Sequence, residues 1–163
     1  MNIEPAIIEA RTVWLADPAT TLDAGARLAR GLGGGMVVTC AGELGAGKTT
    51  LVRGVLRGLG WQGAVKSPTY GMVEHYKFSS LYFYHFDFYR VADVDEWDDL
   101  GFGEYFRPDS VCMIEWPERV QARLPAADLS VTLAVDRDGR SARLAARTGR
   151  GNACLDALAA PLG

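Results

Sequence analysis

The segment from Gly42 to Thr50 reads Gly-Glu-Leu-Gly-Ala-Gly-Lys-Thr-Thr and fits the pattern G-x-x-x-x-G-K-[ST]. Its glycines let the backbone aim several N–H groups into one concavity, which a chain of phosphates can fill. Lys48 adds a positive charge, and Thr49 supplies a hydroxyl for Mg²⁺ where a helix begins. We therefore expect the whole loop to surround ATP, namely Gly42, Glu43, Leu44, Gly45, Ala46, Gly47, Lys48, Thr49 and Thr50.

The flanks of this loop agree with the motif. Residues 36–40 form a short apolar run typical of a strand, and residues 51–59 carry apolar side chains at helical spacing. A phosphate-binding loop requires the order strand, loop, helix. The alternative, a glycine-rich turn without a ligand, is disfavoured in this context.

Glu115 is the candidate second ligand of the metal. Residues 110–114 predict a strand buried on both faces, and Glu115 follows at its carboxyl end. In an open α/β sheet this end faces the same crevice as the phosphate loop. Mg²⁺ is usually coordinated by one or two protein oxygens besides phosphates and water, so we expect Thr49 and Glu115 to bind it. The usual residue is Asp, and the alternative is a solvated carboxylate.

Asp87 and Lys48 are the candidate catalytic residues. Asp87 supplies a carboxylate, and Lys48 supplies a positive charge in the loop. Alternation along residues 81–90 places on one face Phe83, His85, Asp87 and Tyr89, and on the other Tyr82, Tyr84, Phe86 and Phe88. Packing alone does not explain a carboxylate on an aromatic strand, because a carboxylate is rarely buried without a partner. We expect Asp87 to orient or deprotonate the attacking water, or to bind the metal through water. The alternative is a structural pair with Arg90.

Two further groups of residues are candidates for the site. Ser67 and Thr69 flank Pro68 in an extended, hydroxyl-rich loop, and we expect this loop to act like a switch that senses the γ-phosphate. The alternative is a plain turn. For His75 and His85 we expect structural roles, because no partner ligands for a metal site can be identified.

The composition points to one domain, residues 1–163, with a core of its own, because 48% of the residues are hydrophobic. The 17 basic and 20 acidic residues give a net charge of −3, so any contact with RNA is expected to be indirect. No leader peptide or membrane span is recognisable, which predicts a cytoplasmic protein. The 3 cysteines are widely spaced and are expected to be buried free thiols.

Strands mixed with helices predict an α/β fold, a three-layer sandwich. Its parallel centre holds the strands at residues 36–40 and 110–114, and antiparallel hairpins extend it. The hairpins pair residues 72–78 with 81–89, and 131–135 with 142–146. Further expected elements are an edge strand at 12–15, a helix capped by Asp17 or Thr20, a short acidic helix capped by Asp93, and a closing helix at 155–158.

Four segments occur together and in order: the phosphate loop, Ser67-Pro68-Thr69-Tyr70, the run from His85 to Arg90, and Glu115-Trp116-Pro117-Glu118. As a set they resemble the TsaE family of bacterial tRNA threonylcarbamoyladenosine biosynthesis ATPases, which have a P-loop fold.

This resemblance implies a weak cytoplasmic ATPase that uses ATP and Mg²⁺ and works with two protein partners of the tRNA threonylcarbamoyl transferase complex. It also implies that Lys48 and Thr49 hold phosphate and Mg²⁺, that Glu115 binds the metal and that Asp87 serves hydrolysis. Thr69 would lie in the switch-like loop, and Trp116 would support the site.

Two other classes share the loop. A small-molecule kinase would transfer phosphate to a metabolite instead of water, and a nucleotide-binding regulator would bind ATP without turnover. A GTPase is disfavoured, because the chain lacks the Asn-Lys-x-Asp motif that recognises guanine.

Overall fold

The computed structural model describes residues 4–68 and 70–161. The strands are β1 Glu9–Leu15, β2 Val37–Ala41, β3 Val73–Lys77, β4 Tyr82–Asp87, β5 Ser110–Glu115, β6 Leu129–Asp136 and β7 Gly139–Ala146. The helices are α1 Pro18–Ala29, α2 Lys48–Gly58, α3 Glu96–Asp99 and α4 Gly149–Ala159, with short 3₁₀ helices η1 Phe102–Tyr105 and η2 Pro117–Val120.

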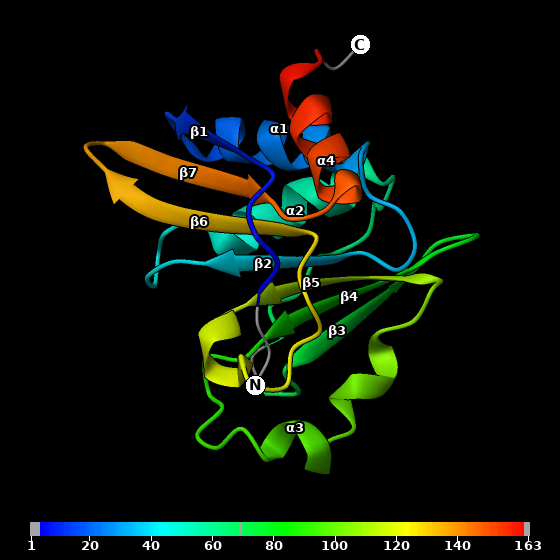
Figure 1. The fold of residues 1–163 in the computed structure, drawn as a ribbon. Coiled ribbons are helices and arrows are strands. Elements are labelled where there is room, and N and C mark those ends of the chain that lie inside the picture. Colours follow the sequence, from blue (N-terminus) through cyan, green and yellow to red (C-terminus); the bar gives the residue numbers. More distant parts are fainter. Residues whose placement is uncertain (1–3, 69, 162–163) are drawn as a thin grey trace.

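All the strands join one 7-stranded sheet in the order β1-β7-β6-β2-β5-β4-β3 (Figure 1). The neighbouring strands β6, β2, β5 and β4 are parallel, whereas β7, β1 and β3 are added antiparallel at the two sides. The predicted α/β sandwich with a parallel centre extended by hairpins is confirmed. The parallel centre brings the carboxyl ends of β2, β4 and β5 to one edge of the sheet.

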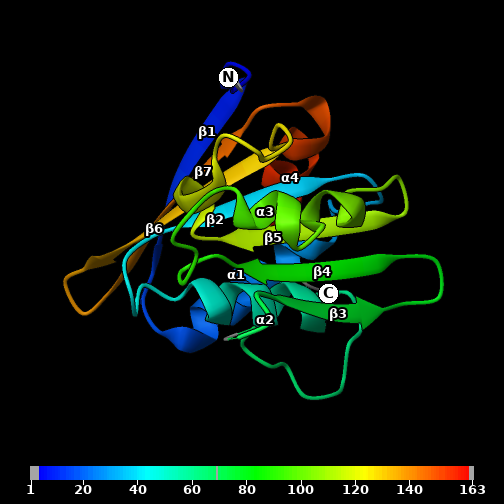
Figure 2. The same ribbon diagram turned by 90° about the horizontal axis from the view of Figure 1, so that it is seen from below.

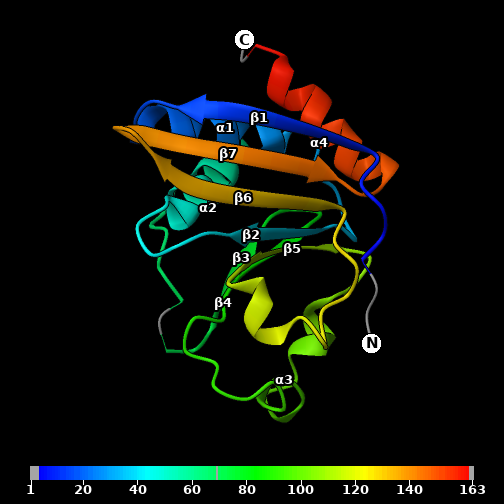
Figure 3. The ribbon, with the colours of Figure 1, turned by 60° about the vertical axis from the view of Figure 1, so that its left-hand side comes forward.

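One face of the sheet is covered by α1, α2 and α4, and the other by α3, η1 and η2 (Figures 1 and 3). On the first face, which we call the helical face, α1 and α2 touch through glycines. A Cβ on Gly25 would lie 2.5 Å from the carbonyl oxygen of Leu51, and one on Gly54 would lie 2.4 Å from that of Leu22. The two helices therefore meet backbone to backbone, which fixes α2 and the loop that leads into it.

The second face, which we call the aromatic face, is covered by short helical segments (Figure 2), and aromatic rings pack beneath them. Phe86 of β4 and Phe88, which directly follows this strand, are fully buried there, with Phe102 and Trp97 against them at ring-centroid distances of 5.4–5.7 Å. Because α3 and η1 each span only 4 residues, their own hydrogen bonds contribute little. Ring burial has to hold this layer in place.

Several local predictions can be compared with the structure. Asp17 caps α1, since its carboxylate accepts the Thr20 N–H at 2.8 Å. The predicted cap at Asp93 is wrong: Asp95 precedes α3, and the Asp93 carboxylate accepts the N–H of Asp95 at 2.9 Å, in the turn before the helix. Helix α2 begins at Lys48, one residue before the predicted start.

The remaining expectations concern the cysteines and the membrane. Cys40, Cys112 and Cys154 are buried free thiols, as predicted. Burial raises the pKa of Cys112 and of Cys154 to about 12, so neither is a reactive thiolate at neutral pH. Within residues 4–68 and 70–161, no helix has both the length and the apolar character needed to span a bilayer.

Candidate functional site

The loop between β2 and α2 has the backbone of a phosphate cradle. Gly42 and Gly47 take φ angles of 151° and 103°, a region that L side chains rarely adopt. A Cβ on Gly42 would also lie 2.5 Å from the carbonyl oxygen of Leu133 in β6. Gly47 precedes α2, whose first N–H groups have no partners within the helix and point toward the loop. The chain therefore offers an anion site at a helix N-terminus.

Lys48 is 5% exposed, and its ammonium group faces the loop. Its Nζ donates to the carbonyl oxygens of Gly42 at 2.5 Å and Glu43 at 2.8 Å. The same Nζ lies 4.5 Å from the ring centroid of Trp116, a cation–π contact that the sequence alone does not specify. An ammonium group has three N–H donors, so a phosphate oxygen can accept the third or replace one of these carbonyls.

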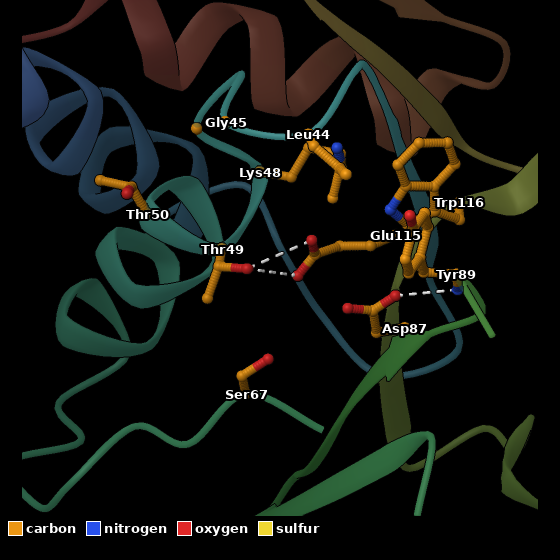
Figure 4. A pocket seen from close by; sticks show the side chains of 11 residues that line it. Leu44, Gly45, Lys48, Thr49, Thr50, Ser67, Asp87, Tyr89, Glu115 and Trp116 are labelled. Atoms are coloured by element: carbon orange, nitrogen blue, oxygen red, sulfur yellow. Dashed lines mark hydrogen bonds between the residues drawn. The ribbon is translucent and has the colours of Figure 1, made fainter. Parts of the chain in front are cut away.

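Thr49 and Glu115 meet across the crevice, as Figure 4 shows. The Thr49 hydroxyl lies 3.2 Å and 3.0 Å from the two carboxylate oxygens of Glu115, which is 2% exposed at the end of β5. Two oxygens bound at right angles to Mg²⁺ at 2.0–2.1 Å are themselves about 3.0 Å apart. The spacing and the oxygen chemistry of this pair therefore fit a magnesium site.

The fit extends to the number of ligands. Among the described residues, no group of three or more His, Cys, Asp or Glu side chains is arranged to hold a metal ion. A magnesium ion in a phosphate loop does not require such a cage, because phosphate oxygens and waters fill most of its six positions.

Asp87 ends β4 directly beside Glu115, its partner in the parallel register of β4 and β5. Its carboxylate accepts the Tyr89 N–H at 3.0 Å. Partial burial raises the pKa of Asp87 above its usual value, the Tyr89 hydrogen bond lowers it, and the negative charge of Glu115 raises it further. The group is thus a carboxylate that gains a proton more readily than an ordinary Asp, as a general base must.

Arg90 does not form the predicted alternative pair with Asp87. Among the described residues no ion pair joins the two, and the Arg90 guanidinium lies over the ring of Tyr70, 5.3 Å from its centroid. The charge of Asp87 is therefore not explained as a partner for Arg90.

The predicted residues gather around one cavity of about 350 Å³. Its lining includes most of the expected residues (Figure 4), namely Leu44, Gly45, Gly47, Lys48, Thr49, Thr50, Ser67, Asp87 and Glu115. Gly42, Glu43 and Ala46 belong to the loop but do not line the cavity. Thr69, the other switch-like residue, lies outside the described residues. Tyr89 and Trp116 also line the cavity, and their rings lie 4.9 Å apart.

Sequence reasoning missed two further contacts, besides the one between Lys48 and Trp116. His85 was expected to be structural, yet its Nε2 lies 2.5 Å from a carboxylate oxygen of Glu115. Its place on the same strand face as Asp87 is the signal that could have indicated this. Arg140 donates to the carbonyl oxygen of Gly45 at the tip of the loop at 3.0 Å. These residues are 95 positions apart, so no local pattern could reveal the contact.

Comparisons with known proteins identify the family of the chain. The family model described as "Threonylcarbamoyl adenosine biosynthesis protein TsaE" matches residues 15–144. The chain is 47% identical over 123 residues to the "tRNA threonylcarbamoyladenosine biosynthesis protein TsaE" of Haemophilus influenzae, covering 76% of this chain and 78% of that protein. It is 33% identical over 144 residues to the protein of the same name from a Nostoc species, covering 85% and 88%.

A solved structure shares the fold of this chain. The crystal structure of Bacillus subtilis YdiB superposes with a TM-score of 0.79 at 27% identity, covering 94% of this chain and 96% of that one. The family match includes the phosphate loop, Asp87 and Glu115 within its bounds. From the family model and these relatives we conclude that the chain belongs to the TsaE family of threonylcarbamoyl adenosine biosynthesis proteins.

Proposed function

We propose that residues 1–163 act as one ATP-binding domain that hydrolyses ATP slowly and serves the threonylcarbamoyl modification of the tRNA adenosine next to the anticodon. The observation that carries the ATPase is the convergence of the phosphate loop with the strand-end carboxylates Asp87 and Glu115 on one cavity. The names of the relatives, which refer to tRNA threonylcarbamoyladenosine biosynthesis, support the process.

Phosphate binding would use the loop backbone and Lys48. The N–H groups of the loop and of the first turn of α2 converge on the concavity, and the helix dipole adds to their attraction for an anion. Lys48 would turn from the carbonyl of Gly42 or Glu43 to the phosphates. Because Lys48 starts from the loop itself, this exchange needs only a local movement.

Thr49 and Glu115 would hold Mg²⁺ with the phosphates, and the ion would neutralise the charge that develops on them. Asp87 would orient a water against the γ-phosphorus and take its proton. The oxygen of that water forms the new P–O bond, the bond to the β-phosphate oxygen breaks, and its electron pair leaves with ADP. The products are ADP and inorganic phosphate, to which Asp87 returns the proton directly or through solvent.

The nucleoside would lie in a second cavity of about 300 Å³ on the other side of the loop. This cavity shares Gly45, Gly47 and Thr50 with the first and is also bordered by Asp17, Pro18 and Arg140. Pro18 offers an exposed apolar surface, and the polar side chains offer hydrogen bonds to a base or ribose. A nucleotide could therefore extend from one cavity to the other along the loop.

Two protein partners of the transferase complex would complete the system, with tRNA contacting this chain only indirectly. The net charge of −3 argues against a phosphate-binding surface for tRNA. Leu44 and Tyr70 are 65% and 84% exposed, and Leu44 also lines the cavity. A partner covering these side chains would sense the bound nucleotide, and ATP would in turn favour the complex. Both partners and the chain would meet in the cytoplasm.

The proposal is tested by steady-state phosphate release from the pure chain, then with the two partner proteins and tRNA added. Asp87→Asn should bind ATP yet lose hydrolysis by on the order of 10² to 10⁴-fold, because the general base acts in the transition state. The matched control is Asp99→Asn, which removes an exposed carboxylate from α3.

The same assay separates the alternatives. Parental turnover by the Asp87 variant would reject the catalytic assignment. The family relationship does not favour a small-molecule kinase. Transfer of phosphate to a metabolite, instead of release as inorganic phosphate, would support a kinase. ATP binding without any phosphate release, even with partners present, would favour a regulator without turnover.

A further inference from the structure

His85 lies on β4 with no exposed surface, in a place that packing alone does not explain. Its Nε2 is 2.5 Å from Oε2 of Glu115, and its Nδ1 has no hydrogen-bond partner within the described part of the chain. A buried ring nitrogen without a partner lowers stability, whereas an apolar side chain could fill the same space without that penalty. Within residues 4–68 and 70–161, the polar contact of this ring is the one with Glu115, which points to a role for that contact.

The carboxylate of Glu115 is contacted from two sides. Thr49, at the start of α2, lies 3.0–3.2 Å from its carboxylate oxygens, and His85 contacts Oε2 from the neighbouring strand. A glutamate has one more rotatable bond than the aspartate usual at this position, so its carboxylate needs more restraint to keep one orientation. A second donor supplies that restraint.

We propose that His85 is a positioning residue, which holds the carboxylate of Glu115 beside Thr49 in the orientation that receives Mg²⁺. The inference rests on the proposed function, since it concerns the metal of the same nucleotide site. Partners that orient a metal ligand in this way commonly change metal affinity by about 10- to 100-fold when they are replaced. Strand β4 would then contribute both the positioning residue His85 and the candidate catalytic residue Asp87, two residues further on.

Two amide variants of the chain of 163 residues separate the length of the side chain at position 85 from its polarity. In His85→Gln the amide nitrogen can take the place of Nε2 and donate to Glu115. In His85→Asn the amide ends near the place of Nδ1 and is too short to do so. The matched control is His75→Asn, because His75 is exposed on β3 and its ring contacts Tyr84 and Tyr105.

The readout is binding of Mn²⁺, a paramagnetic substitute for Mg²⁺, to each protein with a non-hydrolysable ATP analogue, followed by electron paramagnetic resonance. Binding of the analogue in EDTA, and thermal unfolding in EDTA, are measured beside it. His85→Asn should weaken Mn²⁺ binding about tenfold or more. His85→Gln and His75→Asn should stay close to the parental affinity, and binding of the analogue without metal should be unchanged.

Equal Mn²⁺ affinities for the Asn and Gln variants of His85 would contradict the positioning role of His85. Glu115→Gln shows whether the proposed function has failed instead. If Glu115→Gln weakens Mn²⁺ binding while the two His85 variants agree, only the role of His85 is wrong. If the parental protein binds no Mn²⁺ with the analogue, or Glu115→Gln does not change the Mn²⁺ affinity, the proposed metal site is wrong. The positioning role of His85 is then wrong as well.

Discussion

The two faces of the sheet are built differently. The helical face packs aliphatic side chains under α1, α2 and α4, and its two central helices touch through glycine backbone. The aromatic face is held by rings under segments of one helical turn. One layer depends on close backbone contact and the other on the burial of large side chains.

The candidate chemistry lies entirely on the helical side of this division. Phe83 of β4 and Met113 of β5 pack on that face, so His85, Asp87 and Glu115, which follow at even spacing, point the same way. Thr49 approaches them from α2. Close helix packing therefore fixes the position of the site, whereas the aromatic face stabilises the strands that carry its carboxylates.

The largest expected effect is on the aromatic face. Phe102→Ala should lower the free energy of unfolding by about 3–5 kcal/mol, because a buried ring packed against Phe86, Phe88 and Trp97 leaves a cavity. ATP affinity of the folded protein should not change. Urea denaturation and calorimetry measure the two, and Tyr70→Ala is the exposed control. A loss no larger than that control would show that ring burial does not hold this face.

A smaller effect on stability, combined with an effect on the site, is expected on the helical face. Gly54→Ala should cost about 1–3 kcal/mol, since the new methyl group would lie 2.4 Å from the backbone oxygen of Leu22. Helix α2 would shift with Thr49, so ATP affinity should also fall. Gly149→Ala is the matched control, because nothing lies within 4 Å of a Cβ there. Equal stability in the two variants would contradict the close contact of α1 and α2.

The smallest expected effect is a pH dependence that Asp87 introduces. Its pKa is raised in the folded chain from the usual 3.8, so the unfolded chain loses this proton at lower pH. Between 3.8 and the raised value, the free energy of unfolding should fall as pH rises. Asp87→Asn should lack this part of the fall when both proteins are unfolded in EDTA. A difference between them that stays constant with pH would show that Asp87 is not perturbed.

Much of the fold could be predicted because its signals are local. The strand before Gly42 and the helix after it follow from apolar spacing, and Asp17 caps α1 through a side chain only three residues from its partner Thr20. The cap at Asp93 was wrong because Asp93 and Asp95 stand in the same acidic run, and only the backbone decides which of them begins the helix.

The site was predictable to the extent that it follows from a motif and the ends of strands. Glu115 could be placed because an apolar run stops there, and Asp87 because it interrupts an aromatic strand. The contact of His85 with Glu115 depends instead on the parallel register of β4 and β5, which pairs His85 with Met113 and Asp87 with Glu115. Register between strands distant in sequence is a tertiary property that a single sequence does not display.

The most direct test of the account is calorimetric titration of the parental chain and of Lys48→Ala with ATP and Mg²⁺. Removing a charged hydrogen bond to phosphate costs about 1.5–3 kcal/mol, so the affinity should fall roughly 10- to 150-fold. Lys77→Ala, which removes the same charge from an exposed position on β3, should bind like the parent. Equal affinities for the Lys48 variant and the parent would contradict the claim that this loop binds ATP.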